Sequence, residues 1–156
     1  MDGKRVNQAL AHRPQRFWHT LKSIVTPGID KLTTAELVKQ FENAAREHGQ
    51  ASRVLDPRTA NAHFKAMLKI YDLLKTHGIA AQQQLLPLLA SDDVSVRYHT
   101  AVSVLDFDSK HAVEALEQIF ETNTGAMRFS ARMSLEHWRK HRLRLEKADG
   151  KGSSEG

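Results

Sequence analysis

Two histidines near the C-terminus have the spacing of a pair of metal ligands. His137 and His141 are four residues apart, so on a helix they would share one face and could bind one ion together. A zinc site needs a third protein ligand and supporting hydrogen bonds, and no further ligand follows at a recognised spacing. The neighbouring residues would also repel a cation, since four of them are basic: Arg139, Lys140, Arg142 and Arg144. We therefore predict no metal site and no cofactor.

Patterns that carry other kinds of catalysis are missing from the sequence. No serine stands on a glycine-flanked turn that would expose a nucleophile, and no glycine-rich stretch could surround a phosphate. The chain has no cysteine, which excludes disulfides and thiolate zinc sites. The sequence thus predicts a protein that is not an enzyme, and no catalytic residue is assigned.

Two arginines occupy equivalent positions of an internal repeat. A shift of 31 residues superimposes residues 85–104 on residues 116–135 and places Arg97 on Arg128. Asp92 and Asp93 precede Arg97 in its turn, whereas the turn before Arg128 contains no aspartate. A partly buried arginine needs an acidic partner. We therefore predict that these residues form a structural ladder between successive helix pairs: Asp92, Asp93, Arg97 and Arg128.

Start signals and apolar spacing predict the helices that position these residues. Thr33 and Glu36 have the form of a capping box, opening a helix that ends near Gly49 before a connector over residues 50–56. Asp56 and Pro57 begin what is predicted to be the longest helix, which ends near His77. Its inner face is predicted to carry Ala60, Phe64, Met67, Leu68, Tyr71 and Leu74.

The repeat itself is predicted to be two pairs of helices. A short apolar helix with Pro87 in or near its first turn precedes a helix that Asp93 caps. Two more helices follow: Ser109 is predicted to cap the first, and Thr124 and Gly125 lead into the second. Neither pair could bury its apolar face alone, so the pairs are expected to stack.

These motifs resemble known helical repeats. The segment Asp93-Val94-Ser95-Val96-Arg97 is similar to the acidic turn and Val-Arg step of HEAT repeats, and residues 106–116 resemble the same pattern. The opening Leu-Thr-x-x-Glu-Leu and the stretch from Leu32 to His141 resemble the bacterial family named domain of unknown function 2019. The resemblance implies an all-α protein, a short HEAT-like α-α superhelix of stacked antiparallel helix pairs. It implies no activity.

The two ends of the chain differ from the middle in charge. Residues 1–31 carry six Lys and Arg against two Asp and Glu, and residues 137–156 carry six against three, while the whole chain is at +5. The body is therefore slightly acidic, which argues against nucleic acid as the main ligand. We expect at most weak, non-specific nucleic-acid binding through the basic ends.

Three segments follow from these patterns. Residues 1–31 are predicted to be a basic N-terminal segment with one amphipathic helix. Residues 32–142 are predicted to be a HEAT-like helical domain, and residues 143–156 a disordered tail. The amphipathic helix, which carries Phe17 and Trp18, is expected to dock on the domain; a membrane surface or a partner are the alternatives. No apolar run reaches the length of a membrane span, and no secretory signal is present, so a cytoplasmic location is expected.

Three function classes remain open. The first is a non-enzymatic protein-interaction module, either an adaptor or a regulatory scaffold, with an immunity-type inhibitor of a partner protein as a specific version. The alternative is a nucleic-acid-associated HEAT-like protein that binds through its basic ends, and the third class is an unrecognised enzyme. The partner is unidentified. The candidate partner-binding residues are Phe17, Trp18, Arg139, Lys140, Arg142 and Arg144.

Overall fold

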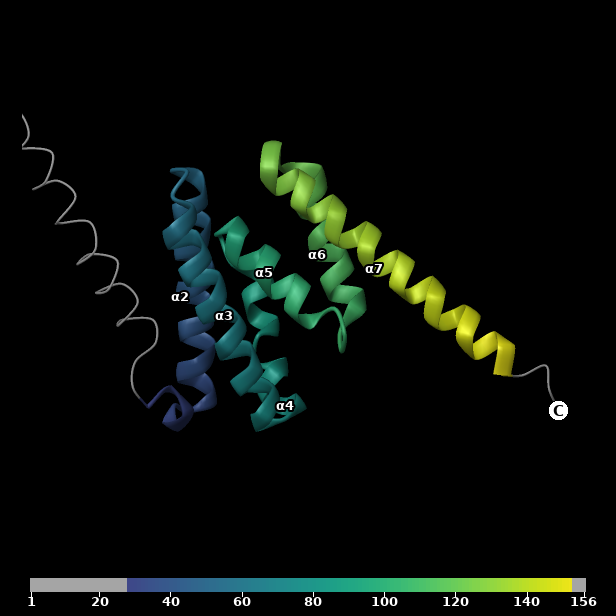
Figure 1. Ribbon diagram of the computed structural model, residues 1–156, viewed down its shortest axis with the longest axis horizontal. Coiled ribbons are helices and arrows are strands. Elements are labelled where there is room, and N and C mark those ends of the chain that lie inside the picture. Colours follow the sequence, from purple (N-terminus) through teal and green to yellow (C-terminus); the bar gives the residue numbers. More distant parts are fainter. Residues whose placement is uncertain (1–27, 153–156) are drawn as a thin grey trace, which may run out of the picture. The chain divides into compact units, whose positions relative to one another are not determined.

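A computed structural model describes residues 28–152 of the chain (Figure 1). Over that range the protein is all-α, as predicted, with six α-helices, two short 3-10 helices and no strand. The chain divides into two compact units, one ending at Gln84 and the other beginning at Leu85. None of the described helices combines the length and the apolar character that crossing a bilayer requires.

The described part of the first unit contains four helical elements: η1 (Ile29–Lys31), α2 (Thr34–Arg53), α3 (Pro57–His77) and α4 (Ile79–Gln83). The caps predicted for α2 and α3 are confirmed. The Thr33 hydroxyl accepts a hydrogen bond from the Glu36 backbone N–H (3.2 Å), and the Glu36 carboxylate accepts one from the Thr33 N–H (2.8 Å). Asp56 accepts from the backbone N–H of Thr59 (3.2 Å), and Pro57 lies in the first turn. Local side-chain chemistry therefore fixes where both helices begin.

The end of α2 differs from the prediction. The helix passes through Gly49 and ends at Arg53, so most of the predicted connector is helical. Gly49 and Ala51 are both buried, and their packing outweighs the roughly 1 kcal/mol that glycine costs inside a helix. Two residues after the end of the helix, the exposed Leu55 has a left-handed φ of 55°, and the chain turns there.

The buried face of α3 is also rotated from the predicted one. Met67 and Leu74 are buried as expected, but Phe64 and Leu68 are exposed. Ala60 is also buried, as predicted. The other buried residues of α3 were not predicted, and they are Ala62, His63, Ala66 and Ile70. Because α2 packs along α3, small residues at the buried positions allow close approach of the two helices. The partly exposed Phe64 still contacts α2, since the centre of its ring lies 5.8 Å from the centre of the His48 ring.

The second unit contains η2 (Leu86–Ala90), α5 (Val94–Val104), α6 (Ser109–Thr122) and α7 (Gly125–Gly152). Pro87 lies in the first turn of η2, as predicted, and η2 is only five residues long. Proline has no N–H to donate and its ring collides with the carbonyl four residues earlier, so a continuous α-helix cannot pass through it. The Asp93 carboxylate then caps α5 and accepts hydrogen bonds from the N–H groups of Ser95 (2.9 Å) and Val96 (3.1 Å).

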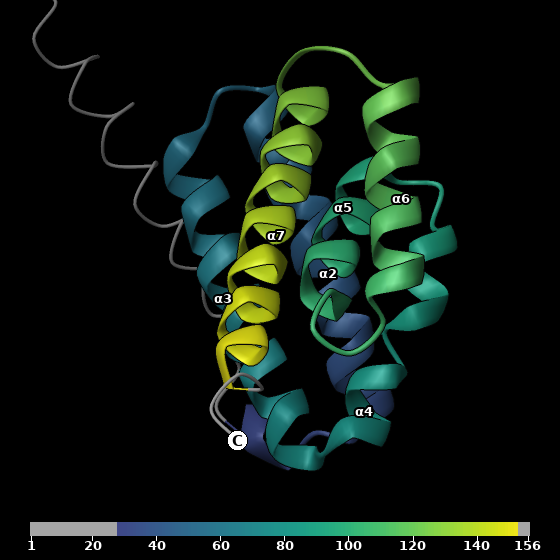
Figure 2. The same ribbon diagram turned by 90° about the vertical axis from the view of Figure 1, so that its right-hand side faces the viewer.

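The helices α6 and α7 form an antiparallel pair, joined by a short turn (Figure 2). Asp108 caps α6 in place of the predicted Ser109, because the Asp108 carboxylate accepts a hydrogen bond from the His111 N–H (3.3 Å). The His111 ring beside it lowers the pKa of the Asp108 carboxyl. A buried apolar cluster joins this pair to α5, and it consists of Ala101, Ala115, Leu116, Ile119, Ala131 and Leu135.

Three pairs of positions related by the 31-residue shift have matching burial, whereas other pairs differ: Val96 is fully buried and its counterpart Met127 is half-buried. Thr100 and Ala131 are both fully buried, and so are Leu85 and Leu116. Val104 is fully buried and its counterpart Leu135 is nearly so. The two halves of the repeat therefore share these three buried positions.

The helix α7 is the longest of the described elements, and it corrects two predictions. It has 28 residues against 21 in α3. It also continues to Gly152, where the sequence predicted a disordered tail from residue 143. Residues 143–150 are all exposed, so tertiary packing does not hold them in the helix. Good helix formers and the Arg142–Glu146 ion pair (2.8 Å) support this helical segment locally.

Candidate functional site

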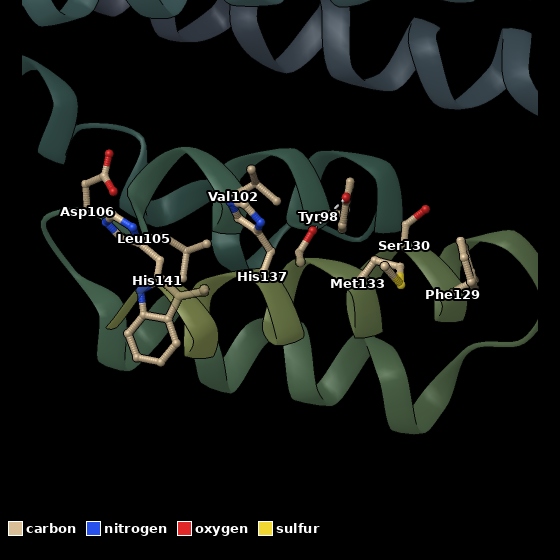
Figure 3. A pocket seen from close by; sticks show the side chains of 11 residues that line it. Tyr98, Val102, Leu105, Asp106, Phe129, Ser130, Met133, His137 and His141 are labelled. Atoms are coloured by element: carbon tan, nitrogen blue, oxygen red, sulfur yellow. Dashed lines mark hydrogen bonds between the residues drawn. The ribbon is translucent and has the colours of Figure 1, made fainter. Parts of the chain in front are cut away.

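The second unit has a groove between α5 and α7, with a cavity volume of about 630 Å³ (Figure 3). One wall comes from α5 and the turn after it: Tyr98, Val102, Leu105 and Asp106. The other wall comes from α7: Phe129, Ser130, Met133, Ser134, His137, Trp138 and His141. All these residues belong to one compact unit, so the groove is a feature of that unit alone.

A hydrogen bond joins the two walls of the groove. The Tyr98 hydroxyl lies 2.9 Å from the Ser134 hydroxyl, and this bond links α5 to α7 (Figure 3). The Asp93 cap fixes the start of α5, while packing of α6 against both helices holds the walls from behind. The groove is thus built on three helices that a common core holds in place.

The walls present apolar side chains to solvent. Phe129 is 60% exposed, Met133 is 44% exposed and Val102 is 40% exposed. Isolated exposed apolar residues are ordinary, but a cluster that lines a hollow marks a surface that another apolar group can cover. The arrangement can therefore bind apolar side chains.

Both histidines that have the spacing of metal ligands, His137 and His141, line this groove. Figure 3 shows the His141 ring on the side of Asp106, whereas the His137 ring points toward Val102. Within residues 28–152, no group of three His, Cys, Asp or Glu side chains is placed to hold a metal ion.

The predicted arginine ladder has different partners in its two halves. The Arg97 guanidinium donates to the Ser91 carbonyl at 2.6 Å, which ties the turn before α5 to the helix. The Arg128 guanidinium lies over the Phe120 ring, 4.3 Å from its centre. Asp93 is the cap of α5. A pairing of the arginines with Asp92 or Asp93 stays a prediction.

Replacing Arg97 with alanine is expected to lower the free energy of unfolding by about 1–3 kcal/mol, because the partly buried Ser91 carbonyl loses its charged donor. Urea denaturation followed by circular dichroism measures the change. Arg128→Ala is the matched control, and it removes a cation–π contact worth only about 0.5–1 kcal/mol at an exposed site. Equal losses for the two variants would contradict the assignment.

The candidate partner-binding residues on α7 fall into two groups. Arg139 forms an ion pair with Glu117 of α6 (2.9 Å), and Arg142 forms one with Glu146 (2.8 Å). Lys140 and Arg144 are exposed, and neither forms an ion pair with another residue of the described range. The other two candidates, Phe17 and Trp18, lie outside the described residues.

The groove was not predicted from the sequence. A signal was available in α7, where Phe129 and Met133 are one turn apart and lie off the face that Ala131 and Leu135 turn to the core. A second apolar face on one helix predicts a second contact surface.

Comparison with known proteins places the chain in a family. The family described as "Domain of unknown function (DUF2019)" matches residues 35–138. The chain belongs to the DUF2019 family. Its members carry no assigned function in that description, so membership supplies a fold and no activity. Most of the groove lies within the matched range, but His141 and the rest of α7 lie beyond it.

A solved structure supports the fold of this DUF2019 protein. The chain is similar to protein RPA1889 from Rhodopseudomonas palustris CGA009, with 26% sequence identity and a TM-score of 0.69. The match covers 72% of this chain and 93% of RPA1889. No curated protein matches the chain.

Proposed function

We propose that this DUF2019 protein is a non-enzymatic protein-interaction module, an adaptor or regulatory scaffold that binds its partner in the α5–α7 groove. The observation that carries the proposal is the cluster of exposed apolar side chains from Val102, Phe129 and Met133 on the groove walls. An immunity-type inhibitor of the bound partner is one form of this function. We further propose that the stacked helix pairs are HEAT-like repeats, and the matching burial at the 31-residue shift supports this.

The geometry of the groove suits a protein partner. Binding sites between helices accept apolar side chains at their centre and polar contacts at their rim. Here the apolar side chains run along the α5–α7 groove from Phe129 at one end through Met133 to Val102, and the polar Asp106 and His141 lie at the other end. A rigid wall of packed helices also keeps the ordering cost of binding low.

The alternative function, nucleic-acid association, has one supporting feature in the basic second half of α7. Two of its arginines, Arg139 and Arg142, already have carboxylate partners. Phosphate contacts dominate nucleic-acid affinity, and they would make no use of the apolar groove. The protein partner is therefore the first candidate.

Substituting Met133 with glutamate is expected to abolish partner capture. A buried, unpaired carboxylate at the centre of an interface opposes association, so recovery should fall by about tenfold or more. The full chain is immobilised, incubated with lysate of the cells that produce it, and the captured proteins are quantified by mass spectrometry. Leu68→Glu is the matched control, because Leu68 is 48% exposed and lies on α3, outside the groove.

The proposed function fails if every captured protein is retained equally by Met133→Glu and by Leu68→Glu. It is supported if at least one protein is lost with Met133→Glu alone while both variants keep the circular dichroism spectrum of the native chain. A photo-crosslinking residue in place of Val102 would then identify the captured protein by its covalent adduct.

A further inference from the structure

The face of α7 that lines the groove continues past the end of the groove. Helical periodicity places Met133, His137, Lys140, Arg144 and Lys147 on one side of the helix, at steps of three or four residues. The first part of this face is apolar and exposed. After His137 this face becomes basic, and its residues Lys140, Arg144 and Lys147 are all exposed. We call these three residues the basic extension of the groove.

The acidic residues of the same segment lie on other sides of α7. At 100° per residue, Glu146 and Asp149 are turned by about 160° and 140° from Arg144. Glu146 is moreover paired with Arg142, at 2.8 Å. Nearer the groove, Glu136 is paired with Arg132 at 3.0 Å. Arg144 and Lys147 have no acidic residue three or four positions away on α7, whereas Lys140 follows Glu136 by one turn.

This order of chemistry along α7 identifies a class of partner. We propose that the groove and its basic extension bind an acidic amphipathic helix of a protein partner, an inference that rests on the proposed function. The apolar face of that helix covers Val102, Phe129 and Met133, and its carboxylates lie against Lys140, Arg144 and Lys147. Charge complementarity between the occupant and the extension sets the specificity, as rim charges do in other interfaces.

The length and shape of the surface agree with a helical occupant. From Phe129 to Lys147 the axis of α7 rises by about 27 Å, which a helix of about 18 residues matches. The groove lies between two helices, where an apolar helix face packs its ridges between those of the walls. A nucleic acid would contact the basic extension but leave the apolar walls uncovered.

The test uses synthetic peptides with the full-length protein. Two fluorescein-labelled peptides of about 20 residues share one stripe of Leu and Phe at helical spacing, with Glu on both flanks in one and Lys in the other. Fluorescence anisotropy gives each dissociation constant. The acidic peptide is expected to bind about tenfold tighter than the basic one, and the preference should shrink at high salt.

Charge-reversal variants locate the binding surface. The double variant Lys140→Glu/Arg144→Glu is expected to raise the dissociation constant of the acidic peptide by about tenfold. Met133→Glu is expected to raise it by a similar factor. The matched control is Lys65→Glu/Lys69→Glu, which reverses two exposed lysines one turn apart on α3 and changes the net charge equally. That control should bind the acidic peptide like the native protein.

The outcomes separate this inference from the proposed function. The inference is overturned if the acidic peptide binds no better than the basic one, or if the α3 control loses as much affinity as Lys140→Glu/Arg144→Glu. It is also overturned if a labelled DNA single strand binds more tightly than the acidic peptide and is insensitive to Met133→Glu. If capture of a cellular protein depends on Met133 but not on Lys140 or Arg144, the proposed function stands and the acidic helix is ruled out as the bound segment.

Discussion

Replacing Leu116 with alanine is expected to lower the free energy of unfolding by about 2–5 kcal/mol. The Leu116 side chain is fully buried in the cluster that α5, α6 and α7 share. Its neighbours there include Ala101, Ala115 and Ala131, whose side chains are too short to fill the space that the lost isobutyl group leaves. The residual cavity therefore adds to the lost transfer free energy. Urea denaturation followed by circular dichroism at 222 nm, the helix band, measures the change.

The control for this prediction lies on the exposed half of α7. Leu143 is 55% exposed, so Leu143→Ala should change the free energy of unfolding by no more than about 0.5 kcal/mol. If Leu116→Ala cost as little as Leu143→Ala, the α6–α7 core described here would be wrong. Because α6 supports the walls of the groove from behind, Leu116→Ala should also weaken binding of the acidic peptide.

The parts of the fold that could be predicted from sequence are those that local chemistry decides. Thr33, Asp56 and Asp93 each cap the helix that was predicted for them, because an N-cap depends only on the next three residues. The all-α class follows from the helical spacing of apolar residues along the whole body. Pro87 lies in the first turn of η2, as predicted, because its backbone has no N–H and that position needs no donor.

The parts that could not be predicted depend on packing between helices. Gly49 looked like the end of α2, yet burial of Gly49 and Ala51 carries the helix past it. The buried face of α3 carries His63 and Ala66, whereas the larger Phe64 is 39% exposed although its ring lies against His48 of α2. The sequence of one helix identifies its most apolar face, but the face that packs against a neighbouring helix can be a different one.

The candidate site shows the same division. His137 and His141 could be singled out as a pair by spacing, but the residues that complete their surroundings, such as Val102 and Asp106, come from α5 and the turn after it. The Tyr98–Ser134 bond joins positions 36 residues apart. Only the packing of α5 on α7 brings these walls together, and no local pattern in the sequence encodes it.

A buried histidine in the first unit should carry an energetic cost. His63 of α3 is only 2% exposed, and neither ring nitrogen has a hydrogen-bond partner within residues 28–152. Burial lowers the pKa of His63 from its ordinary value of 6.5; the nearby Glu47 opposes this shift and His48 adds to it. The folded protein therefore holds His63 as a neutral imidazole whose polar atoms have lost their contact with water.

The sign of the resulting pH dependence follows from proton binding. Above a pH of about 6.5 the ring is neutral in the folded and the unfolded chain, so His63 contributes no pH dependence there. As the pH falls below that value, the unfolded chain binds a proton that the folded chain does not, and stability is lost. The loss proceeds at up to about 1.4 kcal/mol per pH unit until the lowered pKa of the folded state is reached.

Replacing His63 with leucine is accordingly expected to stabilise the protein. Leucine has a similar volume and no polar atom to leave unsatisfied, so the gain should be about 1–3 kcal/mol at a pH of about 8. At a pH of about 5.5 the gain should be larger, because the variant has also lost the proton uptake that favours unfolding. Urea denaturation at both pH values measures the two gains, with His141→Leu, an exposed position of α7, as the control. A His63→Leu protein that is less stable than the native chain at both pH values would show that the imidazole has a partner that contributes to folding, and would make His63 a polar contact of the core instead of a cost to it.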